Sequence, residues 1–163
     1  MSIERATADI EDAYRDSGRI RSCETPFRQF GGKRRFSGAI RTVKVFEDNA
    51  LVRRVTAESG NGSVLVVDGG GSLRAALIGD VIAGLALTNG WSGIVVFGAV
   101  RDVEALAGIP IGIKALGSNP WKSGKAGAGS EGVDVYIGNA KFSPGAYLYS
   151  DDDGILIADS QLA

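Results

Sequence analysis

Three residues of this chain combine charge types that could hold a substrate carboxylate and a divalent metal ion: Asp80, Arg101 and Asp102. Twenty residues separate Asp80 from the Arg101-Asp102 pair, and Glu104 follows two places later. The pair comes directly after the apolar run 93–100, which predicts a buried strand, and ligands of α/β sheets bind at the carboxyl ends of strands. The alternative is a surface cluster of ion pairs that follows a strand.

The absence of histidine from the whole sequence narrows the chemistry further. It excludes Ser-His and Cys-His nucleophilic sites and any zinc site that needs an imidazole ligand. General acid and base roles therefore fall to carboxylates, lysine, tyrosine or metal-bound water.

Composition predicts one globular, soluble domain over residues 1–163, with 44% hydrophobic and 23% charged residues. A net charge of −1 provides no field for direct nucleic-acid binding. The single cysteine, Cys23, suits a reducing compartment. No apolar run is long enough for a membrane span, and residues 1–5 do not resemble a signal peptide. We therefore expect a cytoplasmic protein without a membrane partner.

The elements expected around Asp80, Arg101 and Asp102 alternate between strand and helix in the middle of the chain. Strands dominate the end of the chain. This pattern predicts an α/β fold with a mixed central sheet. The expected strands are 39–46, 64–68, 93–100, 133–138, 140–142 and 154–158, and the expected helices are 3–16, 47–58, 73–78, 80–89 and 101–106.

A helix over residues 80–89 gives Asp80 two possible roles. Asp is a good N-cap, and Gly90 suits the position after the helix end. The first amides, near Val81 and Ile82, are expected to have no partner within the helix and to form an anion site with the help of the helix dipole. Asp80 either takes part in chemistry at this site or only caps the helix.

Three further segments leave alternatives open. The glycine run 69–71 follows an expected strand, but it has neither the P-loop nor the dinucleotide-binding spacing, which favours a simple tight turn. Residues 117–132 predict a long loop in which Lys122 and Lys125 could contact an anionic substrate; a disordered surface loop is the alternative. The acidic run 151–153 is typical of a turn, with cation binding as the other possibility.

Five segments between about residues 22 and 158 carry a family resemblance: FGG at 30–32, TVKVFEDN at 42–49, VLVVDGGGSLR at 64–74, GAVR at 98–101 and SDDDGI at 150–155. Together they resemble the family of regulator of ribonuclease activity A and the related 4-hydroxy-4-methyl-2-oxoglutarate aldolases. The resemblance implies an α/β sandwich with a swivelling-domain-like core. It also implies a homotrimeric ring, which can pair into a hexamer, with active sites between subunits.

The aldolases of this family are similar to one another in an Asp, then twenty residues, then Arg-Asp, which this chain has as Asp80, Arg101 and Asp102. The resemblance implies that the backbone of residues 79–82 holds a pyruvate carboxylate and that Arg101 also binds substrate. It implies that Asp102 holds Mg²⁺ or Mn²⁺ largely through water, and that Asp80 positions or deprotonates a metal-bound water.

The resemblance implies two functions. One is a divalent-metal-dependent lyase that cleaves pyruvate-derived keto acids, by retro-aldol cleavage of 4-hydroxy-4-methyl-2-oxoglutarate or decarboxylation of oxaloacetate. The other is a protein-binding inhibitor of endoribonuclease E in RNA degradation. The regulators of the family can lose the Asp positions, so their retention here favours the enzyme. Both reactions build negative charge on a pyruvate enolate, which a divalent ion with oxygen ligands stabilises.

Overall fold

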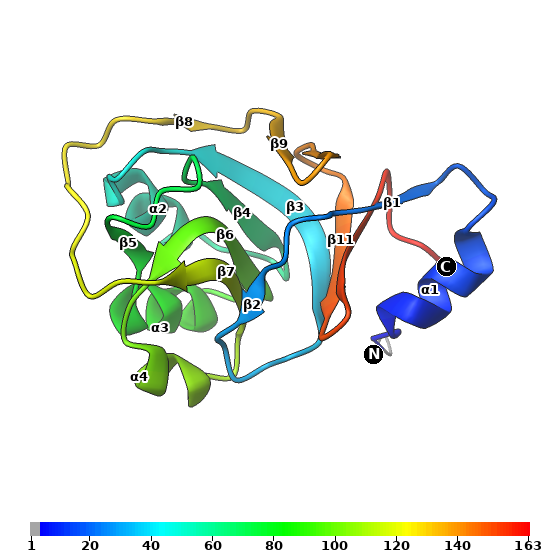
Figure 1. The fold of residues 1–163 in the computed structure, drawn as a ribbon, viewed down its shortest axis with the longest axis horizontal. Coiled ribbons are helices and arrows are strands. Elements are labelled where there is room, and N and C mark those ends of the chain that lie inside the picture. The colour runs from blue at the N-terminus through cyan, green and yellow to red at the C-terminus, as the bar shows by residue number, and fades with distance from the viewer. Residues whose placement is uncertain (1–3) are drawn as a thin grey trace.

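A large mixed sheet organises the part of the chain that the computed structural model describes, residues 4–163 (Figure 1). At its centre, neighbouring strands are parallel in the order β3 (Phe36–Lys44), β4 (Val64–Asp68), β6 (Gly93–Val100) and β7 (Gly112–Ser118). The short strand β5 (Ala76–Ile78) also pairs in parallel with β6. The expected α/β fold with a mixed central sheet is confirmed.

Antiparallel strands extend this sheet on both sides. Next to β3 lie β11 (Tyr147–Asp151), β12 (Gly154–Ala158) and β1 (Ile20–Ser22), in that order. On the other side, β2 (Arg28–Gln29) pairs with β7. The short strand β8 (Ser130–Glu131) pairs with the carboxyl end of β3, on the edge of β3 that β11 occupies farther along. A separate hairpin consists of β9 (Val135–Ile137) and β10 (Ala140–Phe142).

Both faces of the central sheet are covered, which explains the continuous apolar runs of its strands. In β4, Leu65 and Val67 contribute to the core under the helices, and Val64 and Val66 to the core under the β9–β10 hairpin. This alternation follows from the two-residue period of a strand. The helices that cover the face with Leu65 and Val67 are α2 (Ala50–Thr56), α3 (Asp80–Thr88) and α4 (Val103–Ala107). The layers therefore hold β5 and β6, and the residues that follow them, in fixed positions.

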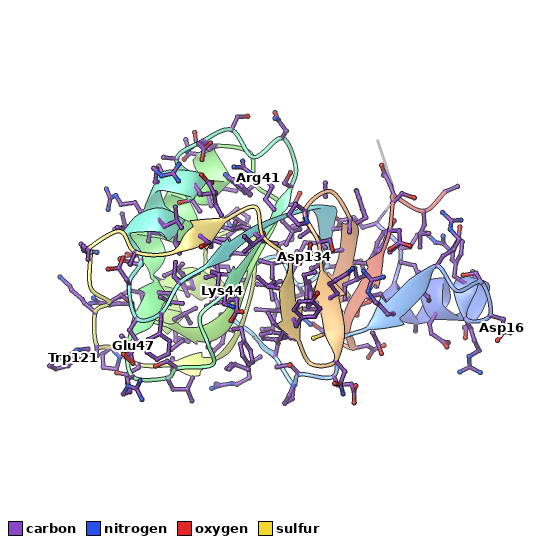
Figure 2. All side chains as sticks on the ribbon, turned by 90° about the horizontal axis from the view of Figure 1, so that it is seen from above. Asp16, Arg41, Lys44, Glu47, Trp121 and Asp134 are labelled. Carbon is purple, nitrogen blue, oxygen red and sulfur yellow. The ribbon has the colours of Figure 1, made fainter. Side chains whose placement is uncertain are left out.

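Helix α1 (Thr7–Tyr14) lies at one end of the molecule, beside the carboxyl terminus (Figure 1). Its Ile10 packs with Tyr149 and Leu156 in a third, smaller core. The opposite end carries Glu47 and Trp121, which Figure 2 shows far from Asp16 after α1. The predicted helix over 3–16 is thus confirmed in shorter form, apart from residue 3, which lies outside the described residues. No helix within residues 4–163 is both long and apolar enough to cross a membrane.

One predicted element near the charged set is wrong. Residues 73–78 were expected to be helical, but Ala76–Ile78 form the strand β5, with its apolar side chains buried. A short apolar run does not distinguish a buried strand from a buried helical segment, because both lack a solvent-facing period. The consequence is important for the site, because the parallel pairing of β5 with β6 brings residue 80 next to residues 101 and 102.

Candidate functional site

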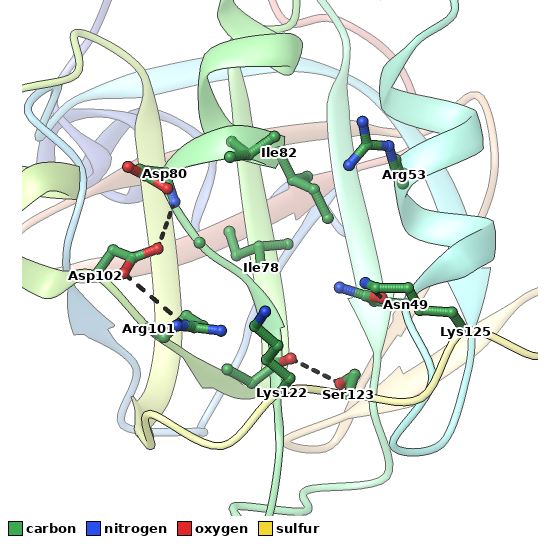
Figure 3. A pocket seen from close by; sticks show the side chains of 13 residues that line it. Asn49, Arg53, Ile78, Asp80, Ile82, Arg101, Asp102, Lys122, Ser123 and Lys125 are labelled. Atoms are coloured by element: carbon green, nitrogen blue, oxygen red, sulfur yellow. Dashed lines mark hydrogen bonds and ion pairs between the residues drawn. The ribbon is translucent and has the colours of Figure 1, made fainter.

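A cavity of about 370 Å³ opens where the carboxyl ends of β5 and β6 meet. It contains every residue predicted from the sequence as a site residue, together with polar side chains from two other segments (Figure 3). The residues that line it are Asn49, Arg53, Ala76, Ile78, Gly79, Asp80, Val81, Ile82, Arg101, Asp102, Lys122, Ser123 and Lys125. Glu104, in the neighbouring helix α4, is not among them.

Arg101 and Asp102 leave the end of β6 in a fixed geometry. The Arg101 amide donates to the Ile78 carbonyl oxygen at 2.9 Å, and Asp102 then adopts a left-handed conformation with φ +58°. This conformation is uncommon for a residue other than glycine, although Asp tolerates it better than most. The sharp turn directs the Asp102 carboxylate back towards the amino end of α3.

The guanidinium of Arg101 is only partly neutralised. Its Nε lies 3.8 Å from Asp102 Oδ1, with 32% and 33% of the two side chains exposed, so the ion pair is loose. This Nε is buried and has no hydrogen-bond partner among residues 4–163. A buried donor without an acceptor is costly, and it is a natural position for an acceptor atom of a ligand.

The amino end of α3 forms the adjoining wall. Gly79 is the N-cap residue and has no side chain that could cap α3, and Asp80 is the first helical residue. Of the two alternatives for Asp80, the structure therefore does not show the capping role; the Asp80 amide instead donates to Asp102 Oδ2 at 3.1 Å. The Asp80 side chain stays exposed at the cavity, and the next two amides lack partners within the helix.

Gly79 permits the close approach of these two segments. A Cβ atom at this position would collide with the Asp102 carboxylate and would lie 3.0 Å from Arg101 Cγ. The backbone φ of −140° is accessible to any residue, so the requirement for glycine is spatial.

The opposite wall comes from α2 and from the segment 119–129. Lys125 Nζ donates to Asn49 Oδ1 at 3.1 Å, and Asn49 Nδ2 donates to the Leu77 carbonyl oxygen at 3.1 Å. Asp48 holds the segment itself, because its carboxylate accepts from the amides of Ala126 at 2.6 Å and Gly127 at 3.1 Å.

Asp48 also shows how the site depends on charge. Burial raises the pKa of its carboxyl group, but the backbone amides of Ala50, Ala126 and Gly127 and the Lys125 ammonium outweigh burial. The net pKa is below the ordinary value, so the charged form of Asp48 holds the segment.

The segment 117–132 is thus pinned to the body of the protein along part of its length. Isolated bridges join Asp48 to Gly124 and Ala76 to Lys122, and the pairing of β8 with β3 follows. Of the two alternatives for Lys122 and Lys125, the structure supports a position at the cavity. Sequence reasoning missed Asn49, Arg53 and Ser123. Only the four-residue spacing of Asn49 and Arg53, which places them on one face of a helix, could have suggested a connection.

The carboxylates of the cavity fit the metal ion that the family resemblance implies. Among residues 4–163, no three His, Cys, Asp or Glu side chains gather as ligands of one metal ion. Mg²⁺ usually keeps several waters and takes only one or two carboxylates from the protein. The Asp102 carboxylate, a third exposed and beside Asp80, fits an ion held largely through water.

The amides of the glycine turn 69–71 already donate hydrogen bonds to oxygen atoms of the protein. The amides of Gly69 and Gly71 both donate to the Phe97 carbonyl oxygen, and the Gly70 amide donates to Asp68 Oδ1. A phosphate cradle needs amides that point outward without partners. The expected simple turn is confirmed, although it leads to the strand β5 rather than to a helix.

Comparison with known proteins identifies the family. The RraA-like family model, described as Aldolase/RraA, matches residues 7–157. The structure of the RNA-processing inhibitor RraA from Thermus thermophilis is 45% identical with a TM-score of 0.93, over 99% of this chain and 96% of that chain. A structure from Geobacillus kaustophilus, described as an S-adenosylmethionine:2-dimethylmenaquinone methyltransferase, is 44% identical with a TM-score of 0.93, over 97% of both chains.

A more distant structure is that of Streptomyces coelicolor RraAS2, described as an unusual member of the RNase ES inhibitor RraA protein family. It is 26% identical with a TM-score of 0.77, over 95% of this chain and 80% of that chain. The match of the family model to most of the sequence, together with the two relatives above 40% identity, shows that this chain belongs to the RraA-like family.

Proposed function

We propose that the chain is a divalent-metal-dependent lyase that cleaves pyruvate-derived keto acids, by retro-aldol cleavage or by decarboxylation. One observation carries the proposal: the same cavity holds the Arg101 guanidinium, the Asp102 carboxylate and the amino end of α3. A 2-keto acid presents a carboxylate and a keto oxygen on adjacent carbons. A cavity with hydrogen-bond donors and with the carboxylates of Asp80 and Asp102 beside them suits such a molecule.

Arg101 and α3 bind the substrate carboxylate in this proposal. The guanidinium offers parallel N–H donors that match a carboxylate, including the buried Nε without a partner. The amides of Val81 and Ile82 add donors at the positive end of the helix dipole. These contacts fix the keto acid so that its reacting C3–C4 bond faces Asp80.

The proposed retro-aldol reaction needs one base and one site for developing negative charge. The C4 hydroxyl loses its proton through water to the Asp80 carboxylate, and the C4 carbonyl forms as the C3–C4 bond breaks. The electron pair moves to C3 and is shared with the keto oxygen as the enolate of pyruvate. The proton held by Asp80 then returns through water to C3 and completes pyruvate. Decarboxylation of oxaloacetate gives the same enolate, with carbon dioxide in place of the second carbonyl product.

Asp102 is the proposed ligand residue for Mg²⁺ or Mn²⁺. A divalent ion, when bound there, stabilises negative charge on the keto oxygen as a Lewis acid. Asp102 also accepts the Asp80 amide, and thus orients the amino end of α3 and the residue proposed as the base.

The test is release of pyruvate from 4-hydroxy-4-methyl-2-oxoglutarate and from oxaloacetate, with Mg²⁺ or with EDTA. We expect release with the metal and its loss with the chelator. Asp80→Asn should lower kcat more than it raises KM, because an amide cannot accept the proton. Substrates that stay intact under all these conditions would refute the lyase.

A second function, inhibition of endoribonuclease E, is favoured by the 45% identity to an RNA-processing inhibitor. We propose that it does not depend on the cavity, since partner surfaces and catalytic sites are separable on one fold. The test is a pull-down with the ribonuclease and an assay of RNA cleavage. Asp102→Ala should bind and inhibit like the unmodified chain; loss of both with an intact fold would show that the two functions share the site.

We also propose a homotrimer, with pairing into a hexamer as a further step. Val81 and Val103 are 62% and 40% exposed, and they directly follow the two acids Asp80 and Asp102. Apolar side chains at the mouth of a polar cavity suit a cover supplied by a neighbouring subunit. Sedimentation should show a trimer at micromolar concentration, and a monomer alone would refute a site between subunits.

A further inference from the structure

The cavity contains more positive charge than a single keto-acid carboxylate requires. Within residues 4–163 it is lined by four cationic side chains and two carboxylates, a net formal charge of +2, whereas the whole chain has a net charge of −1. The two carboxylates, Asp80 and Asp102, lie together on one side (Figure 3). The lining charges are thus separated into a mixed end and an end whose charged lining side chains are all cationic, although the Asp48 carboxylate lies near Lys125 outside the lining.

The cationic end is separated from the keto-acid end by apolar side chains. Figure 3 shows Arg53, Asn49 and Lys125 on the side opposite Asp80 and Asp102, with Ile78 and Ile82 between the two sides. A ligand that reaches both ends needs an anionic group at each end and a short carbon chain between them.

Lys122 emerges from a fixed point of the backbone. The Ala76 amide donates to the Trp121 carbonyl oxygen at 2.8 Å, and Ser123 Oγ donates to the Ala76 carbonyl oxygen at 2.7 Å. The residues on both sides of Lys122 are therefore bound to the same residue of β5. The Lys122 side chain projects into the cavity between Arg101 and Asn49 (Figure 3).

Arg53 differs from its neighbour on α2 in a way that points to a ligand. Arg54 pairs with Glu131 at 2.8 Å and with Glu58 at 3.8 Å, outside this cavity. Arg53 lines the cavity and forms no ion pair or side-chain hydrogen bond with any residue from 4 to 163. Arg53 is exposed, and Figure 3 shows its side chain at the cavity on the side opposite Asp80, so its guanidinium is accessible to an anionic ligand.

We infer that Arg53 and Lys122 form a second anion-binding lobe, which holds the distal carboxylate of a dicarboxylic 2-keto acid while Arg101 holds the carboxylate beside the keto group. This inference deepens the proposed function and rests on it for the orientation of the substrate. Lys125, held by Asn49, adds positive charge beside the lobe. Arg53 and Lys122 thus become the residues that determine specificity for dicarboxylic over monocarboxylic substrates.

The lobe also discriminates between the two proposed reactions. In a 4-hydroxy-2-oxoglutarate, the distal carboxylate stays on the departing keto acid and lies one bond farther from the keto group than in oxaloacetate. In oxaloacetate the distal carboxylate is itself lost as carbon dioxide. A cation bound to that group stabilises the ground state more than the transition state and does not accelerate the reaction. The lobe therefore favours retro-aldol substrates.

Binding of two keto acids that the reaction does not cleave tests the lobe without turnover. The full chain with Mg²⁺ is titrated calorimetrically with 2-oxoglutarate, which has a distal carboxylate, and with 2-oxobutyrate, which lacks one. We expect at least about tenfold tighter binding of 2-oxoglutarate, the effect of one charge-assisted contact. In Arg53→Gln and in Lys122→Gln, the ratio of the two dissociation constants, 2-oxobutyrate over 2-oxoglutarate, should fall to about threefold or less. Arg54→Gln, the same charge change on the same helix, should keep the wild-type ratio.

A wild-type ratio near one, or a ratio that both variants preserve, would overturn the inference. A kinetic measurement adds an independent check: Arg53→Gln should lower the ratio of kcat/KM for retro-aldol cleavage to kcat/KM for decarboxylation by about tenfold. An equal loss in both reactions would also contradict the lobe. Preference for 2-oxoglutarate without pyruvate release from any substrate would confirm the lobe and refute the lyase, so the two failures are distinguishable.

Discussion

Asp48→Asn should loosen the segment that carries Lys125 while it leaves α2 folded. The Asp48 carboxylate uses Oδ1 for the amides of Ala50 at 3.2 Å and Gly127 at 3.1 Å, and Oδ2 for the Ala126 amide at 2.6 Å. Asparagine keeps one oxygen for the first two amides. It places an NH₂ group against the Ala126 amide, so that two donors face each other.

The expected cost follows from these contacts. A hydrogen bond to a charged group contributes about 1.5–3 kcal/mol, and a buried amide without an acceptor costs about 1–3 kcal/mol. Because the segment can shift to expose the Ala126 amide to water, we expect a net loss of about 2 kcal/mol in the free energy of local opening. Each 1.4 kcal/mol is a factor of ten, so amide exchange at Ala126 and Gly127 should become roughly 30-fold faster.

The assay is amide hydrogen exchange of these two residues, with the amides of β6 as internal reference. Asp134→Asn is a matched control, because Asp134 is exposed and forms no side-chain hydrogen bond within residues 4–163. Unchanged exchange at Ala126 in Asp48→Asn would refute the reasoning. Equal acceleration in the β6 amides would also refute it, since that result would indicate global rather than local opening.

Three further outcomes are expected. The Asp48 pKa is lowered on folding, so the stability that this carboxylate adds to the segment is complete above the ordinary pKa of 3.8 and is lost as the pH falls below it. The protection of the Ala126 and Gly127 amides from hydrogen exchange, corrected for intrinsic rates, should therefore stay constant from pH 7 to 5. Gly79→Ala should lower the free energy of unfolding by about 1–3 kcal/mol, because the added methyl group overpacks against Asp102. Gly84→Ala, within the helix that Gly79 begins, should raise it by up to about 1 kcal/mol, because nothing lies within 4 Å of the added Cβ. Equal shifts of the melting temperature in the two variants would contradict the steric argument. Arg101→Lys should raise KM for both substrates with little change in melting temperature, because an ammonium cannot form the guanidinium fork; an unchanged KM would exclude the proposed carboxylate contact.

The central part of the fold was predictable from the sequence because its signals are local. The run 93–100 is apolar throughout, and β6 has the expected bounds. Gly90 has φ +82°, as expected for a glycine just after a helix, and α3 ends two residues before it. The position of Arg101 and Asp102 at the end of β6 follows from these local signals alone.

The rest of the site depends on contacts between distant parts of the chain. Asp80 looks like a helix cap in sequence, but the Asp102 carboxylate, 22 residues away, accepts the amide at the helix start. Lys122 reaches the cavity only because its segment pairs with Ala76, and Lys125 because Asp48 binds the next two amides. No local pattern encodes such pairings, and β5 itself is too short for its apolar residues to show a period.

The most direct test of the central claim is metal-dependent pyruvate release by Asp102→Asn. Asparagine keeps the shape and an oxygen acceptor for the Asp80 amide, so the fold should stay intact. A full charge acting over a few ångströms at an effective dielectric of ~20 is worth about 4 kcal/mol. Solvent screening at a side chain that is 33% exposed reduces this to roughly 2–3 kcal/mol. We therefore predict a loss of about 10²-fold in the Mg²⁺-dependent rate; a folded Asp102→Asn protein with wild-type, EDTA-sensitive turnover would contradict the proposed lyase.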